Sequence, residues 1–328
     1  MQSFEWVDVT SIEEASRLLA AGSLAGPVVA KAGGVDLVDL MKEGIVRPAR
    51  ILNLKTIPEL DSLTVEPSGD LRIGALVTLA QLATAPEIRT HYSALSQAAE
   101  HAATPQVRNA ATIGGNLLQR PRCWYYRSAH FHLEGADPAT AGIRGEHQYH
   151  AIFDNQASAM VHASTPATEL LAFGARVELK AASGRQRVVP LSAFLLPPDA
   201  KRAHDADIQP DEILTAVIVP GPDGSRSAYH KQTERESYDW PICDVAVVLR
   251  LDAEVVREAS IVLGWVAPMP RHAIAAEAVL RGAQLTEDVA RRAARAAVEG
   301  ATPLPKNAYK VPILEAVVRR TILAAAAP

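Results

Sequence analysis

Two glycine-rich segments are the parts of this chain whose residue types and spacing could do chemistry. They are residues 32–37 (AGGVDL) and 111–117 (ATIGGNL), and each follows an apolar stretch that is typical of a strand. Glycine is required where the backbone turns sharply or lies against a ligand. Successive free N–H groups in such a turn bind an anion, typically a phosphate. Two such segments indicate a ligand with two phosphates, so a dinucleotide cofactor is the first hypothesis.

The common nucleotide-binding signatures are absent from both segments. Neither contains G-x-G-x-x-G or Gly-Lys-Ser/Thr. A double glycine also occurs in ordinary loops, so either segment alone is weak evidence. If both bind a dinucleotide, the fold is of another kind. The sequence also shows no Ser/His/Asp triad or carboxylate pair at a motif-like spacing, so we expect no catalytic side chain here.

The composition limits the class of protein and its partners. The chain has 328 residues, enough for two domains, and 48% are hydrophobic. Its 33 basic and 37 acidic residues leave a formal charge of −4, which argues against nucleic acid or an anionic membrane as the main partner. No apolar run approaches the ~18 residues of a membrane span, so we expect no span.

Cysteine usage and the first residues bear on the compartment. Cys123 and Cys243 are the only cysteines, which is no disulfide framework and fits a reducing compartment. Residues 1–8 carry two acids and no base, unlike a signal peptide. We therefore expect a cytoplasmic protein, with the periplasm, reached by co-export with a partner subunit, as the alternative.

The elements that must position the first glycine segment form a β-α-β-α-β unit. Hydrophobic periodicity and helix-end signals predict strands at 4–9, 28–30 and 51–54 and helices at 12–20 and 36–42. The first glycine segment therefore lies between a strand and a helix.

The second glycine segment lies in a longer region of mixed elements, interrupted by an aperiodic excursion at residues 119–150 that is functional or vestigial. We predict a hairpin at 63–66 and 71–73, helices at 78–83, 93–103 and 167–173, ordered stretches at 149–153 and 159–162, and strands at 175–181, 187–189 and 213–219.

A cluster of turn residues at 220–225 is the best domain boundary. Beyond it we predict strands at 227–232, 242–251 and 259–266, then helices at 271–280, 287–298 and 308–325. Strands followed by helices indicate an α+β fold with helices on one face of an antiparallel sheet. We predict a two-lobed domain at 1–222 (lobes about 1–57 and 58–222) and a C-terminal domain at 223–328 with three strands and three helices.

Several segments together resemble the FAD-binding medium subunit of the molybdenum hydroxylases, the family of xanthine dehydrogenase, aldehyde oxidoreductase and CO dehydrogenase. Residues 32–42 and 108–117 are similar to its two FAD-binding segments. Later segments of the chain are also similar to segments of this family and occur in the same order over nearly the whole chain. They are residues 211–215, the pair Tyr229 and Lys231, and residues 264–273.

This resemblance implies a vanillyl-alcohol-oxidase-like (PCMH-type) fold that holds FAD between two α+β lobes. The resemblance implies that Lys231 lies beside the isoalloxazine and stabilises its anionic reduced form. Without the resemblance, the sequence would predict a solvated lysine on a strand. The cofactor-binding residues that the resemblance implies are Ala30, Lys31, Ala32, Gly33, Gly34, Val35, Asp36, Leu37, Thr112, Ile113, Gly114, Gly115, Asn116, Thr165, Leu214 and Lys231.

One position departs from the family pattern. Family members place an aspartate in the turn before the helix at 167, whereas this chain has Thr165 there. Thr165 can make one hydrogen bond to a cofactor and also suits a helix N-cap. A charged contact with the cofactor is therefore not expected at this position.

The excursion at 119–150 resembles a loop that carries a [4Fe–4S] cluster in some aldehyde oxidoreductases. Such a cluster needs four cysteine thiolates, and only Cys123 stands in a matching place. We therefore expect the loop without the cluster. The spacings His130-x-His132 and His147-x-x-His150 could bind zinc or copper, but no further ligands complete a site, so we expect no metal.

The arginine and aromatic residues at 120–127 favour a partner-contact loop over nucleic acid. By resemblance, the partners are a large molybdopterin subunit and a small subunit with two [2Fe–2S] clusters. The chain would pass electrons from these clusters through FAD to O₂, NAD⁺ or a quinone-like acceptor. The alternatives are a flavin-free structural subunit and a stand-alone FAD oxidase.

Overall fold

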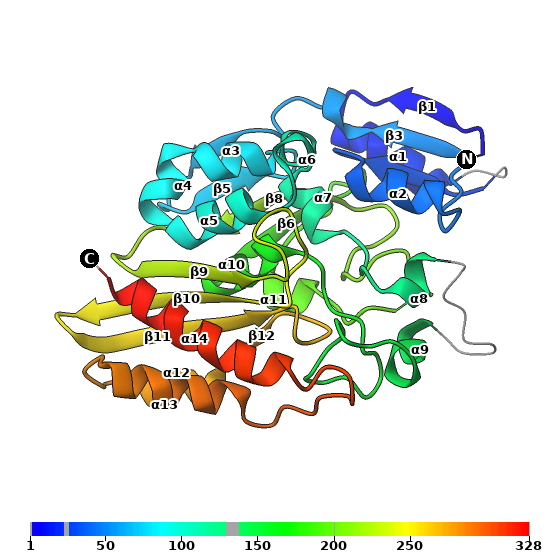
Figure 1. Ribbon diagram of the computed structural model, residues 1–328. Coiled ribbons are helices and arrows are strands. Elements are labelled where there is room, and N and C mark those ends of the chain that lie inside the picture. Colours follow the sequence, from blue (N-terminus) through cyan, green and yellow to red (C-terminus); the bar gives the residue numbers. More distant parts are fainter. Residues whose placement is uncertain (1, 23–25, 129–137, 200, 328) are drawn as a thin grey trace.

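The computed structural model describes residues 2–22, 26–128, 138–199 and 201–327. The N-terminal lobe is a parallel sheet in the order β1-β3-β2. Its elements, from the N-terminus, are β1 (Glu5–Asp8), α1 (Ile12–Ala21), β2 (Val28–Lys31), α2 (Val35–Lys42) and β3 (Arg50–Asn53) (Figure 1). The predicted β-α-β-α-β unit is therefore confirmed, and its second crossover carries the first glycine segment.

The second lobe is built on a five-stranded antiparallel sheet in the order β4-β5-β8-β6-β7. Its strands are β4 (Leu63–Val65), β5 (Leu71–Gly74), β6 (Arg176–Lys180), β7 (Gln186–Pro190) and β8 (Ile213–Val219). β8 is the central strand and all its residues are buried.

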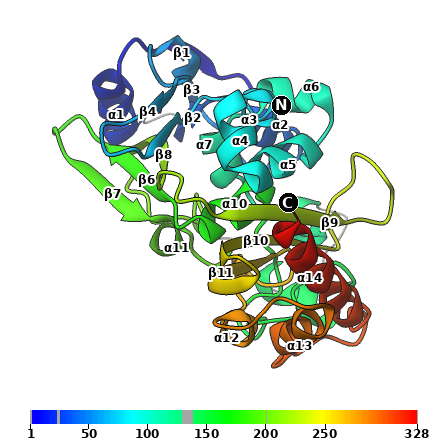
Figure 2. The same ribbon diagram turned by 90° about the vertical axis from the view of Figure 1, so that its left-hand side faces the viewer.

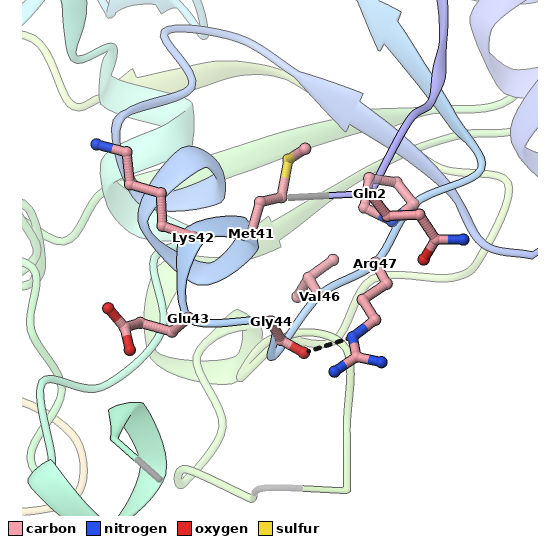
Figure 3. Close-up of a pocket in the computed structure, with 8 residues that line it drawn as sticks. Gln2, Met41, Lys42, Glu43, Gly44, Val46 and Arg47 are labelled. Atoms are coloured by element: carbon pink, nitrogen blue, oxygen red, sulfur yellow. Dashed lines mark hydrogen bonds between the residues drawn. The ribbon is translucent and has the colours of Figure 1, made fainter. Parts of the chain in front are cut away.

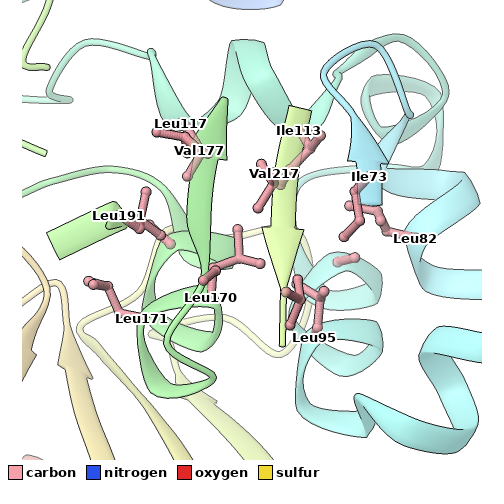
Figure 4. Packing of buried hydrophobic residues seen from close by; sticks show 14 of the residues in the cluster. Ile73, Leu82, Leu95, Ile113, Leu117, Leu170, Leu171, Val177, Leu191 and Val217 are labelled. Atoms are coloured by element: carbon pink, nitrogen blue, oxygen red, sulfur yellow. The ribbon is translucent and has the colours of Figure 1, made fainter. Parts of the chain in front are cut away.

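Short helices cover this second sheet. They are α3 (Leu79–Thr84), α4 (Pro86–His91), α5 (Ser93–His101), α6 (Pro105–Ala110), α7 (Ile113–Leu117), α10 (Thr165–Ala172) and α11 (Leu191–Phe194). The short helix η1 (Leu54–Thr56) follows β3 and contacts β2 of the first sheet. Figure 4 shows Val217 of β8 in the core between the other strands and the buried leucines of α5 and α10.

One sequence expectation for this lobe is wrong. The second glycine segment follows α6 rather than a strand, because Thr104 caps a new helix by accepting the N–H of Val107 and Pro105 suits its first turn. Residues 113–117 then form the short helix α7. The stretches 149–153 and 159–162 lie outside helices and strands, and the excursion contains two short helices, α8 (Trp124–Arg127) and α9 (Pro138–Arg144).

The C-terminal sheet has four strands in the order β12-β11-β10-β9, which corrects the expected three. The strands are β9 (Arg226–Gln232), β10 (Cys243–Asp252), β11 (Val255–Gly264) and β12 (Arg271–His272). The sequence had assigned residues 271–272 to a helix, but they pair with Leu263 and Val262 of β11. Two residues are too few to show a period, so only the pairing reveals the strand.

Helices cover both faces of this sheet, as Figures 1 and 2 show. On one face lie the three C-terminal helices α12 (Ile274–Leu280), α13 (Glu287–Val298) and α14 (Lys310–Ala326). On the other face, α5 packs on β9 and α10 packs on β10 and β11. In the part of the chain that the structure describes, no helix, including α14, combines the length and hydropathy needed to cross a membrane.

Candidate cofactor site

The first glycine segment presents backbone N–H groups at an uncapped helix start. β2 ends at Lys31 and α2 begins at Val35. Gly34, the N-cap residue, has a φ of +78°, a left-handed conformation that favours glycine, and no side chain caps the helix. The first N–H groups of a helix lack partners within the helix and lie at the positive end of its dipole. This end of α2 can therefore bind an anion such as a phosphate.

The two glycine segments are in contact, although they are far apart in the sequence. A Cβ on Gly33 would lie 2.0 Å from the carbonyl oxygen of Ala110 and 3.3 Å from the Cα of Ala111. A Cβ on Gly115 would lie 3.9 Å from the Cβ of Ala32. Figure 1 shows α7 beside α2 at this junction. The absence of a side chain at position 33 thus permits a backbone contact that joins the segments into one region.

The second glycine segment is not an open anion-binding turn, which corrects the sequence expectation. The N–H groups of Ile113 and Gly114 both donate to carbonyl oxygens of the connection between β5 and α3, at 2.9 Å. The N–H of Gly115 donates to the hydroxyl of Thr112 at 3.3 Å. These N–H groups have protein acceptors, so the segment contributes close packing rather than free donors.

Packing also explains where Leu214 lies. A Cβ on Gly114 would lie 2.9 Å from both the Cβ of Ala75 and the Cδ2 of Leu214. Leu214 and Ile113 are buried in the core of the second lobe. The structure therefore places Leu214 against the second glycine segment as a packing residue.

The carboxylate of Asp36 is held by the excursion at 119–150. It accepts the backbone N–H of Arg120 at 2.9 Å and pairs with the guanidinium groups of Arg122 at 2.8 Å and Arg127 at 2.6 Å. Asp39, on the same helix, pairs with Arg127 at 2.6 Å. These contacts fix α2 against the excursion, so Asp36 acts on the glycine segment by orienting its helix.

Lys31 folds back over the segment that follows it. Its ammonium donates to the carbonyl oxygen of Ala32 at 3.1 Å and lies 5.2 Å from the centre of the Trp6 ring. Partial burial lowers the pKa of Lys31, and the positive charge of Lys55 lowers it further. A cation and the free N–H groups of α2 therefore occur at the same segment, and both favour an anionic ligand.

The second segment is joined to the start of α10. Ser164, rather than Thr165, is the N-cap: its hydroxyl accepts the N–H of Ala167 at 3.2 Å and donates to the amide oxygen of Asn116 at 2.6 Å. Thr165 is the buried first residue of the helix. It lies beside Tyr229 of β9, where its influence partly opposes the rise that burial causes in the pKa of Tyr229.

Lys231 lies on β9, opposite Asp244 of β10. Its ammonium donates to the carbonyl oxygen of His101 in α5 at 2.9 Å. Burial lowers the pKa of Lys231, while the charges of Asp244 and Asp239 oppose the change. The amine is therefore half-buried between the C-terminal sheet and α5 and is not an ordinary solvated strand lysine.

The predicted residues fall into two groups in space. Direct contacts join the first glycine segment to the second, and the second to Leu214 and, through Ser164, to the start of α10. Lys231 is outside this set and lies across β9 and β10 from Asp244, which accepts the hydroxyl of Tyr229.

Sequence reasoning missed a buried polar group in α10. Glu169 is 0% exposed, and within the described part of the chain neither of its carboxylate oxygens has a hydrogen-bond partner. Burial, followed by the nearby Asp244, raises the pKa of Glu169 well above its usual range. The available signal was a single acid inside the stretch 167–173, whose other residues, apart from Thr168, are apolar.

The excursion places Cys123 beside a histidine. The Sγ of Cys123 lies 3.2 Å from the Nε2 of His150, next to a cavity of about 40 Å³. Burial raises the pKa of Cys123 and lowers that of His150 to about 4, so the pair is a thiol and a neutral imidazole. Among the described residues, no three potential metal ligands come together, and His130 and His132 lie outside the described residues.

A larger cavity lies at the opposite end of α2 from the first glycine segment. It has a volume of about 250 Å³ and is lined by the end of α2 and the connection to β3 (Figure 3). Arg47 closes this connection by donating to the carbonyl oxygen of Gly44 at 3.1 Å. The lining contains none of the predicted cofactor residues, so this cavity is separate from the candidate site.

Comparison with known proteins defines the class. Residues 2–222 match the model of the FAD-binding domain in molybdopterin dehydrogenase, and residues 228–325 match the model of the CO dehydrogenase flavoprotein C-terminal domain. The chain therefore belongs to the family of FAD-binding subunits found in aldehyde oxidoreductase, CO dehydrogenase and xanthine dehydrogenase, and it is an oxidoreductase subunit with a FAD-binding domain.

Individual relatives cover nearly the whole chain. The aldehyde oxidoreductase FAD-binding subunit of Escherichia coli (strain K12) is 32% identical over 95% of this chain and 94% of its own length. The carbon monoxide dehydrogenase medium chain of Hydrogenophaga pseudoflava is 28% identical over 98% and 96%. A solved structure of carbon monoxide dehydrogenase from that organism matches with a TM-score of 0.77, at 26% identity, over 99% of this chain and 97% of its own.

The residues at the glycine segments fit FAD. The uncapped start of α2 and the adjacent ammonium of Lys31 suit a diphosphate. The space at Gly33, which no side chain could share, lets the second segment approach the first. The fit therefore rests on one anion-binding helix end and one packed glycine segment.

Proposed function

We propose that this chain is the FAD-carrying electron-transfer subunit of a molybdenum-dependent hydroxylase or aldehyde oxidoreductase. The observation that carries the proposal is the backbone contact of Gly33 with Ala110 and Ala111. It unites two glycine segments in a chain whose residues 2–222 match a FAD-binding domain.

In this proposal, residues 30–37 hold the diphosphate of FAD, chiefly through the N–H groups of α2 and the ammonium of Lys31. The side of the site that faces the flavin is formed by residues 112–116, Thr165 and Leu214. Among these, Asn116 and Thr165 provide polar groups. FAD, when bound, exchanges electrons singly or in pairs and so connects one-electron and two-electron partners. Lys231 places a positive charge at the domain interface that favours negative charge on the isoalloxazine.

The proposed partners supply the rest of the reaction. Relatives are named as medium chains or FAD subunits, which supports a multi-subunit complex. We propose a large molybdopterin subunit, a small subunit with two [2Fe–2S] clusters, and O₂, NAD⁺ or a quinone-like acceptor. The organic substrate would bind in the large subunit, and this chain would need no acid or base for it.

The finer architecture belongs to the same proposal. We assign a vanillyl-alcohol-oxidase-like (PCMH-type) fold to residues 1–222, with lobes at about 1–57 and 58–222 and the excursion at 119–150 as a partner-contact loop. Residues 223–328 form the second domain. The expected compartment is the cytoplasm, or the periplasm by co-export with a partner.

The test is purification of the chain from its native host, with identification of bound cofactor and partners. A flavin absorption spectrum and co-purification of molybdopterin and iron–sulfur subunits would support the proposal. A colourless chain within such a complex would indicate the flavin-free structural subunit. A yellow, active, single polypeptide would indicate the stand-alone oxidase.

A further inference from the structure

Two buried carboxyl groups lie in the interface between the first 222 residues and the C-terminal sheet. Glu169 is on α10 and Asp244 is on β10, and both are 0% exposed. α10 packs directly on β10 and β11. The two acids therefore come from facing elements that are far apart in the sequence.

The two acids have different surroundings. Asp244 accepts hydrogen bonds from the hydroxyls of Tyr229 and Thr168, both at 3.2 Å. Its Oδ1 fills the space above Gly264, where a Cβ would lie 1.8 Å away. Glu169 has no hydrogen-bond partner among the described residues. An unpartnered charge in such a place is very unfavourable, so Glu169 is neutral and carries a proton.

The electrostatics favour one negative charge on this pair rather than two. Burial raises the pKa of Glu169 and, despite the opposing hydrogen bond from Tyr229, raises that of Asp244 to about 7. Nearby carboxyls in a dry site cannot both ionise easily, so they titrate as a unit. The titratable groups that face the pair are Tyr229 and Lys231 on β9, Cys243 on β10, Lys310 on α14, and His101 on α5, which stacks on Tyr229.

Two of the residues proposed to lie near the flavin, Thr165 and Lys231, are close to this pair of acids. Thr165 lies beside Tyr229, which donates to Asp244, and Lys231 lies directly across from Asp244. Thr165, Thr168 and Glu169 share one face of α10, because residues three and four apart on a helix are neighbours. A change of charge at the flavin site would therefore reach the pair through protein with little screening by water.

We propose that the Glu169–Asp244 pair is a redox-linked proton site, an inference that rests on the proposed function. When two electrons from an iron–sulfur donor add negative charge at the flavin site, a carboxylate of the pair takes a proton from solvent and forms an O–H bond. When the electrons leave to the acceptor, that O–H bond breaks and the proton returns to solvent. No electron passes through the pair. Its uptake of a proton limits the build-up of negative charge in the interface.

The test counts protons taken up by the full-length chain loaded with FAD. The protein is reduced anaerobically with a measured amount of dithionite in weakly buffered solution at pH 7.5, and a pH indicator reports the uptake. Asp244→Asn keeps the shape of the side chain and removes the carboxylate that can take up the proton, since Glu169 is already protonated. Glu277→Gln is the matched control, because Glu277 is buried on the other face of the sheet, where it accepts the N–H of Ile261 at 2.9 Å.

We expect Asp244→Asn to take up about half a proton less per two electrons than the wild type, the value for a carboxyl whose pKa rises by ~1 unit on reduction from near pH 7. Glu277→Gln should match the wild type. Since all variants are treated alike, protons released by dithionite cancel in the difference. Equal uptake in fully flavin-loaded wild type and Asp244→Asn would overturn the inference and leave the proposed function intact.

Two further outcomes are decisive. If the wild type binds no flavin, the proposed function fails and this inference fails with it. If Asp244→Asn does not fold, the reduced-minus-oxidised infrared difference spectrum of the wild type decides. A gained protonated-carboxyl band supports the proton site, and the absence of that band contradicts it.

Discussion

Replacing Gly33 by alanine should separate the two glycine segments. The new Cβ would lie 2.0 Å from the carbonyl oxygen of Ala110, whereas ordinary contact begins near 3.4 Å, so one segment must move by roughly 1.4 Å. The neighbouring atoms are also backbone, the carbonyl carbon of Ala110 at 2.8 Å and the Cα of Ala111 at 3.3 Å. No side chain can rotate away to relieve the overlap.

The expected cost follows from overpacking. Inserting a methyl group into a packed site costs about 1–3 kcal/mol. If the strain is expressed when FAD draws the segments together, affinity for FAD falls about 10- to 100-fold, since ~1.4 kcal/mol is a factor of ten. The assay is titration of the apoprotein with FAD, followed by flavin fluorescence, together with urea unfolding of the apoprotein.

Gly221→Ala is the matched control. Its Cβ would lie 2.7 Å from the carbonyl oxygen of Gly69, so it also overlaps backbone, but it lies beyond the far end of β8 from Leu214. Gly221→Ala should lower the free energy of unfolding and leave FAD affinity unchanged. Wild-type FAD affinity in Gly33→Ala would refute the idea that the segment contact forms the site.

Three further predictions concern the buried polar groups. Arg120→Met should lower the free energy of unfolding by about 3–5 kcal/mol, because it leaves Asp205, its buried partner at 2.7 Å, without a counter-charge; a loss below about 1 kcal/mol in urea unfolding would contradict this. Since burial raises the folded-state pKa of Asp244 to about 7, its stabilising contribution is present at low pH and is lost as pH rises toward 7. Burial likewise raises the folded-state pKa of Glu169 well above its usual range, so Glu169→Gln, which removes that titration, should gain stability relative to the wild type between pH 5 and pH 8, and a constant difference would exclude a raised pKa at Glu169. Iron analysis of the purified chain should find no cluster at Cys123, and four iron atoms per chain would overturn that expectation.

The local part of the fold could be predicted from the sequence because its signals are local. Alternating and helical periodicity gave the β-α-β-α-β unit around the first glycine segment, and its strand and helix ends agree with the structure within a few residues. The sequence did not predict α6, the helix that precedes the second glycine segment. Thr104 and Pro105, which directly follow the helix predicted at 93–103, begin another helix.

Three features of this protein were determined by the sequence alone. Residues 32–37 and 111–117 resemble two FAD-binding segments, the chain has too few cysteines for a [4Fe–4S] cluster, and strands precede helices in the last hundred residues. Each of these properties resides in residue types and in short spacings.

Only the tertiary structure decided how these parts meet. It set Gly33 against Ala110, tied Asp36 to the excursion, gave the C-terminal sheet a fourth strand, and put Glu169 opposite Asp244. The physical reason is that each such contact depends on the packing of elements distant in sequence. Glu169 and Asp244 acquire unusual proton affinities because the fold removes their water and, for Glu169, places another acid nearby.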